Sequence, residues 1–200
     1  SHNWNLMPDL KKKLVNSDYQ FITLVYKACF YFPNFYQINT KTKKIYSDCN
    51  IESQYKILSE ANNSTIIFFG RLPLYLNKNY FDNEEGGIES DYWDRKFVSK
   101  IEDLTIQQSF KKEVIKLAKK NKIILIYPFP EAGWDIPKKI SNLSSKNSEM
   151  IKIYQMPKNF ITTSYQVYKK RTKSSYNLLD SVEDKNIFRI FMERYGRNMD

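Results

Sequence analysis

Two short apolar runs that stop abruptly constrain the fold of this chain most strongly. Residues 65–69 (TIIFF) end at Gly70, and residues 122–127 (KIILIY) end at Pro128. Continuous apolar runs of this length are typical of parallel strands that are covered on both faces. Between them, residues 106–120 carry apolar side chains at helical spacing, with lysines on the opposite face. The order strand, helix, strand predicts a parallel sheet with crossover helices.

The rest of the chain continues this alternation. Apolar periodicity and β-branched or aromatic runs predict helices over residues 5–16, 51–61 and 161–179, and strands over residues 20–26 and 187–191. Irregular structure is expected over residues 29–49 and a polar loop over residues 138–150. The pattern predicts one α/β domain over residues 1–200, with a three-layer, flavodoxin-like parallel sheet and helices on both of its faces.

Composition excludes several classes of protein and of site. With 200 residues, 42% of them apolar, the chain is long enough to bury a core. No apolar run approaches the ~18 residues of a membrane span. Two cysteines exclude a zinc ribbon, and the one histidine, His2, excludes most histidine-rich metal sites. The same single histidine at position 2 also excludes a Ser-His-Asp triad whose histidine lies later in this sequence. We therefore expect no metal and no cofactor.

The formal net charge of +10 leaves two interpretations open. One is an anionic partner, such as nucleic acid, a membrane surface or an acidic glycan. The other is a solvated, lysine-rich surface, because only six of the 32 basic residues are arginines, which specific phosphate or base recognition favours. We favour the solvated surface and expect no nucleic-acid partner.

The most specific segment is the loop expected after the second apolar run, residues 128–137 (PFPEAGWDIP). Its three prolines restrict the backbone. It follows a strand of a parallel sheet, which is where such folds place their sites. Glu131, Trp134 and Asp135 are its candidate functional residues. A plain proline-rich turn is the structural alternative, but the length and position of the loop favour a site.

This loop resembles the P-x-PE-x-GWDVP stretch of the SGNH-type domains that are attached to acyltransferase-3 family membrane proteins. Other segments fit the same family in order. Ser1-His2 is similar to the end of its Gly-Asp-Ser-His nucleophile block, and Cys29 and Cys49 match a cysteine pair. Residues 66–75 (IIFFGRLPLY) are similar to the family strand that ends in an Arg-aromatic step.

The resemblance implies an SGNH hydrolase-like fold and a serine nucleophile. Ser1 stands at the position of the nucleophile. Gly70 and Arg71 stand where the third block of the family supplies donors to an oxyanion. The base of the family is a distant histidine in an Asp-x-x-His block, so His2 is expected to line the site. The residues expected at the oxyanion position or lining the site are Gly70, Arg71, His2, Glu131 and Trp134.

The resemblance also implies a function and a place in the cell. The domain is expected to move an acetyl or other small acyl group through a serine ester onto a cell-surface polysaccharide or glycan, or to hydrolyse such an ester. Its partners are a carbohydrate acceptor and an acyltransferase-3 type membrane domain in the same parent chain. The expected location is extracytoplasmic, tethered to the inner membrane. In that oxidising compartment Cys29 and Cys49 are expected to form a disulfide.

The chain departs from the family pattern in ways that keep a second hypothesis open. The strand and Gly-Asp before Ser1 and the later Asp-x-x-His block are not among the 200 residues, and Leu72 replaces the aromatic residue. We interpret the chain as a domain trimmed at both ends and inactive by itself. The alternative is a catalytically degenerate SGNH-like binding or docking module. Ser1-His2 as the remnant of a cleaved tag is a further alternative, disfavoured by the family-like Leu6, Pro8 and Leu10 that follow.

Overall fold

Three parallel strands form the sheet at whose end the candidate site lies. They are β2 (Thr65–Phe68), β4 (Lys122–Ile126) and β5 (Ile187–Ile190), in the spatial order β2-β4-β5. In the central strand, Ile123 and Leu125 are fully buried. The apolar runs recognised in the sequence therefore form parallel strands as predicted, but the predicted cover on both faces was wrong for β2, where Ile66 and Phe68 are buried and Ile67 is 38% exposed.

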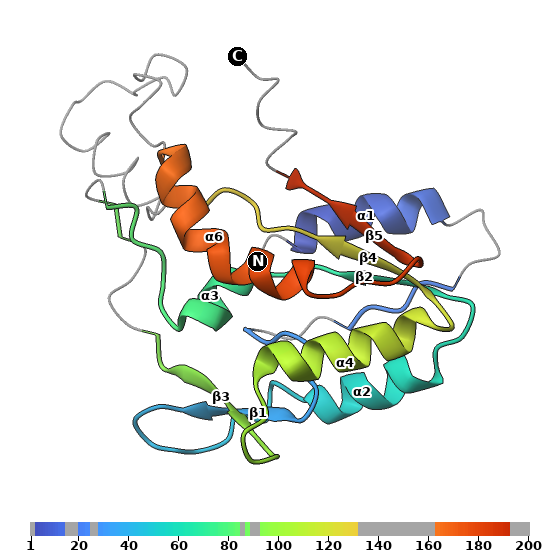
Figure 1. Ribbon diagram of the computed structural model, residues 1–200, viewed down its shortest axis with the longest axis horizontal. Coiled ribbons are helices and arrows are strands. Elements are labelled where there is room, and N and C mark those ends of the chain that lie inside the picture. The colour runs from blue at the N-terminus through green and yellow to red at the C-terminus, as the bar shows by residue number, and fades with distance from the viewer. Residues whose placement is uncertain are drawn as a thin grey trace.

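The computed structural model describes residues 3–14, 20–24, 28–84, 87–88, 93–131 and 163–192. The other elements in this part of the chain are α1 (Asn3–Leu14), β1 (Phe35–Asn39), α2 (Ile51–Glu60), α3 (Leu72–Asn77), β3 (Arg95–Ser99), α4 (Ile106–Ala118) and α6 (Tyr165–Asp180). Figure 1 shows α2 and α4 below the parallel sheet and α1 on the opposite side of it. The fold belongs to the α/β class.

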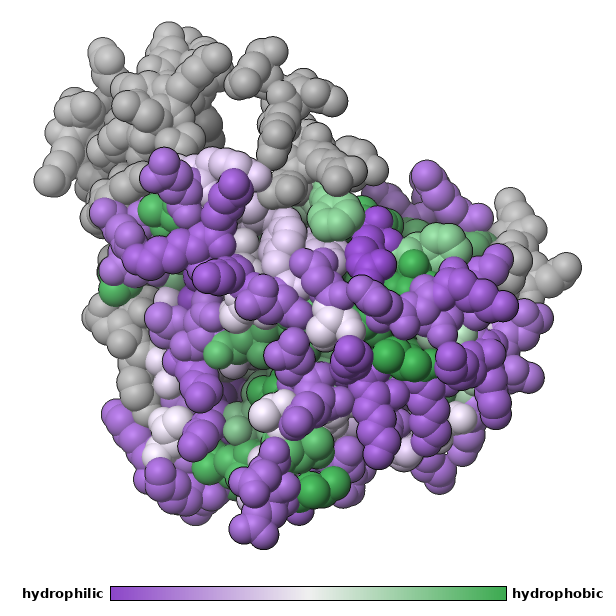
Figure 2. Space-filling view, viewed as in Figure 1, coloured by the Kyte–Doolittle hydropathy of each residue, from purple (hydrophilic) through white to green (hydrophobic). Residues whose placement is uncertain are grey.

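Helix α4 forms as its apolar spacing indicates. Thr105 and Gln108 make a reciprocal capping box at its start, since each side chain accepts the backbone N–H of the other residue, at 3.1 and 3.0 Å. Phe110 and Val114 lie on its inner face and are fully buried. The lysines of its outer face are exposed. Figure 2 shows hydrophilic residues over most of the face turned to the viewer in Figure 1.

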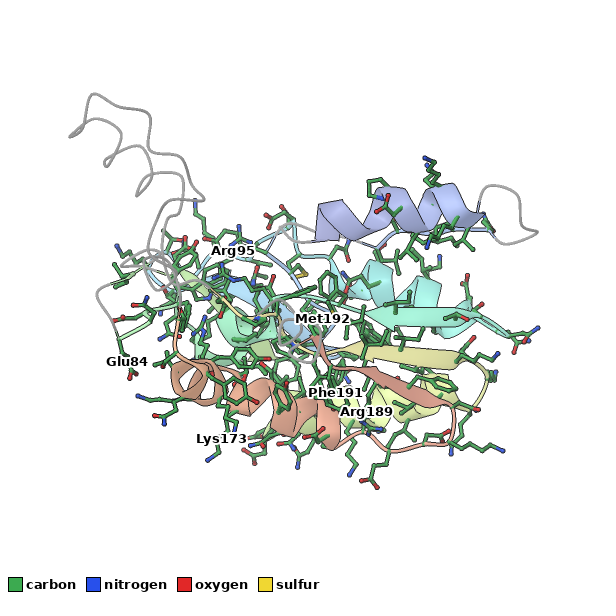
Figure 3. All side chains as sticks on the ribbon, turned by 90° about the horizontal axis from the view of Figure 1, so that it is seen from above. Glu84, Arg95, Lys173, Arg189, Phe191 and Met192 are labelled. Atoms are coloured by element: carbon green, nitrogen blue, oxygen red, sulfur yellow. A yellow bond between two sulfur atoms is a disulfide. The ribbon has the colours of Figure 1, made fainter. Side chains whose placement is uncertain are left out.

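The residues that follow β4 and β5 form a smaller aromatic group with the second half of α6. The ring of Phe191, which follows β5, lies 4.3 Å from that of Tyr127 between ring centroids (Figure 3). Tyr176 of α6 lies 4.8 Å from the same Tyr127 ring. Of the other tyrosines of α6, Tyr168 is buried and Tyr165 is exposed.

A second, antiparallel sheet lies outside the predicted alternation. Strand β1 pairs with β3, with Phe35 opposite Ser99. The prediction of irregular structure over residues 29–49 was therefore wrong for β1, and β3 was not predicted at all. Gln37 of β1 is fully buried, and its side-chain oxygen accepts a hydrogen bond from Nη1 of Arg95 at 2.9 Å. The partner that stabilises each strand lies far away in the sequence, so neither strand has a strong local signal.

Residues 20–24 do not form a strand, so the prediction for residues 20–26 was wrong there, and residues 25–27 lie outside the described part. A strand needs a neighbour to pair with, and no described strand pairs with this segment. Instead, a cavity of about 480 Å³ is lined by this segment, by β2 and by Leu10 of α1. Ile22 and Ile67, which are among its lining residues, are 59% and 38% exposed.

Short helix α3 was also missed, because its six residues follow Gly-Arg and include Pro73. Proline is tolerated in a first helical turn, and Leu72 and Leu74 bury its inner face. The helices predicted over residues 5–16, 51–61 and 161–179 correspond to α1, α2 and α6. The polar loop predicted over residues 138–150 lies outside the described residues.

Cys29 and Cys49 form a disulfide, as predicted, with 5.2 Å between their Cα atoms. Cys49 directly precedes Asn50, whose side chain caps α2 by accepting the backbone N–H of Ser53. The disulfide therefore ties the segment before β1 to the start of α2.

Loss of this disulfide should lower the free energy of unfolding by about 3 kcal/mol, because it closes a loop with a sequence separation of 20. We expect the Cys29→Ala/Cys49→Ala variant to unfold at a lower urea concentration than the oxidised chain, as measured by circular dichroism. The variant also serves as the control for reduction, since a reductant should shift the midpoint of the unsubstituted chain alone. An unsubstituted chain that unfolds at the same urea concentration with and without reductant would contradict this prediction.

Candidate functional site

The exits of β2 and β4 bring two candidate residues together. Phe68 of β2 pairs with Leu125 of β4 in parallel register, so both strands end at the same edge of the sheet. Gly70 and Arg71 follow β2, and Glu131 lies in the loop that follows β4. Nε of Arg71 donates a hydrogen bond to Oε1 of Glu131 at 2.5 Å. This edge is where α/β sheets of the parallel kind place their sites.

Gly70 is a glycine for a reason of packing. A Cβ at this position would lie 2.7 Å from Cδ2 of Phe30, which is closer than real Cβ atoms approach. The Phe30 ring is buried and lies among other aromatic rings, including those of Phe32, Phe68 and Phe110. The core therefore requires a residue without a side chain at the exit of β2, and an oxyanion role for the Gly70 N–H is a separate proposal.

The Glu131 carboxylate lies between two arginines. Its Oε1 accepts from Arg71, and its Oε2 accepts from Nε of Arg171 at 2.9 Å. The side chains of Glu131 and Arg171 are 8% and 6% exposed, and that of Arg71 is 25% exposed. Burying a carboxylate is costly unless it is paired and hydrogen-bonded, and two guanidinium partners meet that need. These three side chains together carry one net positive charge.

Sequence reasoning missed Arg171 as a site residue. It lies on α6, where the buried positions Tyr168, Arg171, Ser175 and Leu178 repeat at helical spacing. The signal was present, because an arginine on the buried stripe of an amphipathic helix requires a buried partner. The identity of that partner came only from the fold, since Glu131 lies 40 positions earlier in the sequence.

Further hydrogen bonds attach α6 to the exit of β4 and to α3. The hydroxyl of Tyr168 donates to the carbonyl of Pro128 at 2.9 Å. Nδ2 of Asn77, the last residue of α3, donates to the backbone carbonyl of Arg171 at 2.8 Å, and Ser174 Oγ donates to Oδ1 of Asn77 at 2.6 Å. Helix α6 thus holds both segments that carry Arg71 and Glu131.

The described groups around Arg71 are not placed to act as a general base. Burial raises the pKa of Tyr75 to about 12, and the charges of Arg71 and Arg95 oppose that rise. The Tyr75 hydroxyl therefore keeps its proton near neutral pH. Each oxygen of Glu131 accepts a guanidinium N–H, so this carboxylate supports the arginines instead of receiving a proton from a nucleophile. Histidine, the commonest base, occurs only as His2.

Three of the predicted site residues, Ser1, His2 and Trp134, lie outside the described residues, as does Asp135. Their distance from Arg71 therefore stays a prediction. Within the described ranges, no three His, Cys, Asp or Glu side chains lie together in a way that could hold a metal ion. The helices in the same ranges include none with the length and apolar character needed to cross a membrane.

A family model described as the SGNH domain, fused to AT3 domains, matches residues 1–194. The chain belongs to this family. No curated protein and no solved structure matches it.

Membership in the SGNH family confirms the resemblance inferred from the loop at residues 128–137 and from the cysteine pair. The family description, fused to AT3 domains, supports an acyltransferase or esterase type of role. It also supports a membrane acyltransferase as the partner domain and a membrane-tethered parent protein.

The close contact at Gly70 leads to a test of the packing at the exit of β2. Gly70→Ala should lower the free energy of unfolding by about 1–3 kcal/mol, because the new methyl group meets the Phe30 ring. The cost should be smaller in a Phe30→Leu background, where the smaller side chain leaves room. Urea unfolding of the two single variants and the double variant measures this coupling. Strictly additive losses would show that the two positions do not interact.

Proposed function

We propose that this SGNH domain transfers small acyl groups through a serine ester to a cell-surface polysaccharide or glycan, or hydrolyses such esters. The observation that carries the proposal is the Arg71–Glu131 pair at the carboxyl ends of β2 and β4, in a chain whose family is described as fused to AT3 domains. A positive group at this edge of a parallel sheet suits a reaction in which an oxyanion forms.

In this proposal Ser1 is the nucleophile. Its Oγ forms a bond to the carbonyl carbon of an acyl donor while the hydroxyl proton passes to a base. The base is the histidine of an Asp-x-x-His block, which we place in the parent chain after residue 200. Collapse of the tetrahedral intermediate breaks the bond to the leaving oxygen, which takes the proton. An acceptor hydroxyl then receives the acyl group by the same steps in reverse.

The remaining site residues have supporting roles in the proposal. The N–H of Gly70 and the guanidinium of Arg71 stabilise the negative charge that develops on the carbonyl oxygen. His2, Glu131 and Trp134 line the site. The acyl donor is delivered by an acyltransferase-3 type membrane domain of the same parent chain, and the reaction needs no cofactor. The disulfide supports an extracytoplasmic location, because such bonds persist in oxidising compartments.

We further propose that a strand preceding Ser1 completes a three-layer, flavodoxin-like, SGNH hydrolase-like sheet. The cavity of about 480 Å³ lined by residues 20–24 and β2 supports this, since Ile22 and Ile67, which line it, are partly exposed and no described strand pairs with β2 on the side away from β4. An unpaired edge strand with exposed apolar side chains is a site for strand addition. A strand there would end at Ser1, directly before α1.

This proposal predicts protection of β2 in a longer version of the chain that includes the residues before Ser1. The backbone amides of β2 that point away from β4 should exchange with solvent at least about tenfold more slowly than in the 200-residue chain, the change expected for one added hydrogen bond per group. Hydrogen exchange read by mass spectrometry measures this, with α4, which lies away from the cavity, as the internal control. Unchanged exchange in β2 would contradict the added strand.

A second candidate function is a binding or docking module without enzyme activity. In this module the described Glu131, held by two arginines, contributes to a fixed polar surface and takes no part in a reaction. Such a module would bind acylated or free glycan at the same edge of the sheet.

The two candidates differ in the activity of the longer chain. The 200-residue chain should hydrolyse p-nitrophenyl acetate no faster than a blank, because loss of triad members costs roughly 10⁴ to 10⁶ in rate. A version extended before Ser1 and through an Asp-x-x-His block after Asp200 should recover turnover. In it, Ser1→Ala should abolish the gain and His2→Ala should reduce it less.

The exposed serine of α2, Ser59, supplies the matched control, since Ser59→Ala should keep full turnover. Equal turnover with and without Ser1→Ala would reject Ser1 as the nucleophile. An inactive extended chain that binds glycan in calorimetry would favour the binding module.

A further inference from the structure

Three charged side chains form a continuous series from the interior of the domain to the exit of β2. Arg171 donates to Glu131 at 2.9 Å, and Arg71 donates to the other oxygen of Glu131 at 2.5 Å. Exposure rises along the series, from 6% for the Arg171 side chain to 8% for Glu131 and 25% for Arg71. The buried end is therefore Arg171, and the end that reaches the candidate site is Arg71.

We propose that Arg171 is a positioning residue that acts through Glu131 to hold the guanidinium of Arg71 at the carboxyl ends of β2 and β4. Its catalytic consequence rests on the proposed acyl transfer. The positioning itself is a property of the domain that needs no activity to be observed.

Arg171 is the fixed member of the series because its guanidinium has partners on several sides. Nη1 donates to Oδ1 of Asn79 at 2.7 Å, and Nη2 donates to the backbone carbonyl of the same residue at 3.0 Å. Its guanidinium carbon lies 5.4 Å from the centre of the Phe81 ring. An arginine whose planar set of donors is engaged by acceptors in this way keeps one orientation, and a lysine would keep the charge without the fork.

Glu131 transmits this orientation because both of its oxygens are engaged. A carboxylate that accepts at one oxygen only is free to rotate about its last bond. Accepting Nε–H from Arg171 at Oε2 fixes the direction of Oε1, and Oε1 is the atom that receives Arg71. The carboxylate therefore links the position of Arg71 to α6.

Arg71 benefits from a fixed partner such as Glu131 because of its position at the end of β2. It is the residue before α3, and it makes no side-chain capping hydrogen bond to that helix. A long side chain at the end of a strand has many rotamers, and ordering them costs free energy. A misplacement of about 1 Å at a reacting centre costs as much as 10²-fold in rate, so a pre-positioned guanidinium is worth more to the reaction than a mobile one.

A purely structural role for Arg171 makes different predictions. Contacts between α3 and α6 do not depend on its side chain alone, because Asn77 donates to the Arg171 backbone carbonyl and also accepts from Ser174. These bonds persist when the side chain is changed. We therefore expect Arg171→Lys to fold, with a thermal unfolding midpoint lowered by the loss of its guanidinium bonds to Asn79, and to lose position at Arg71 at temperatures where it is still fully folded.

The first test uses the 200-residue chain labelled with ¹⁵N. The Nε–H of Arg71 should be protected from exchange in the unsubstituted chain. It should exchange about tenfold faster in Arg171→Lys and in Glu131→Gln, since a charge-assisted bond is weakened. Asp184→Asn is the matched control: Asp184 is 9% exposed and accepts from Lys119 at 3.0 Å, but it precedes β5 at the opposite end of the sheet. An unchanged Arg71 signal in Arg171→Lys would overturn the proposal.

The second test uses the extended, active version and separates positioning from folding. Arg171→Lys should lower kcat about tenfold to a hundredfold with little change in KM. The same substitution in an Arg71→Gln background should cause no further loss, because its effect passes through Arg71. Equal losses in both backgrounds, or a loss of kcat matched by a loss of folded protein, would overturn the positioning role. If the extended chain is inactive, the proposed function fails, and the exchange of the Arg71 Nε–H still decides the inference.

Discussion

The candidate site depends on the parallel pairing of β2 with β4. Because the two strands run in the same direction with Phe68 beside Leu125, the chain leaves both of them at one edge of the sheet. That geometry brings Arg71 and Glu131, which are 60 positions apart, within hydrogen-bond distance. Helix α6 then covers this edge and supplies the second arginine. An antiparallel pairing of the same strands would have placed the two residues at opposite ends.

Charge burial explains why the site is built from three residues and not two. A carboxylate as buried as Glu131 is costly to remove from water, and one partly exposed arginine offsets that cost only in part. The second guanidinium, on α6, completes the hydrogen bonding of the carboxylate and adds a net positive charge. The same arrangement that makes the carboxylate tolerable in the interior also orients Arg71. Stability and a proposed role in the acyl-transfer reaction therefore rest on the same contacts.

Prediction from the sequence succeeded where the signal was local or was carried by the family pattern. The runs TIIFF and KIILIY form β2 and β4 because a continuous apolar stretch has few other stable outcomes. The loop that begins at Pro128 identified the family, and the cysteine pair forms a disulfide. The prediction of a strand failed for residues 20–24. Their β-branched and aromatic composition favours a strand, but no described strand pairs with them. Prediction failed also for β1 and β3, which stabilise each other across a long separation.

The sequence by itself determined the class of the fold, its main strands and helices, the cysteine pair and membership in the SGNH family. These follow from periodicity, from composition and from a motif, all of which are properties of neighbouring residues. Only the tertiary structure decided that Gly70 is a glycine because Phe30 lies against it. It also decided that Arg171 is the second partner of Glu131. Close packing and the pairing of buried charges join residues that the chain keeps far apart, and only the folded arrangement of strands and helices specifies which of them meet.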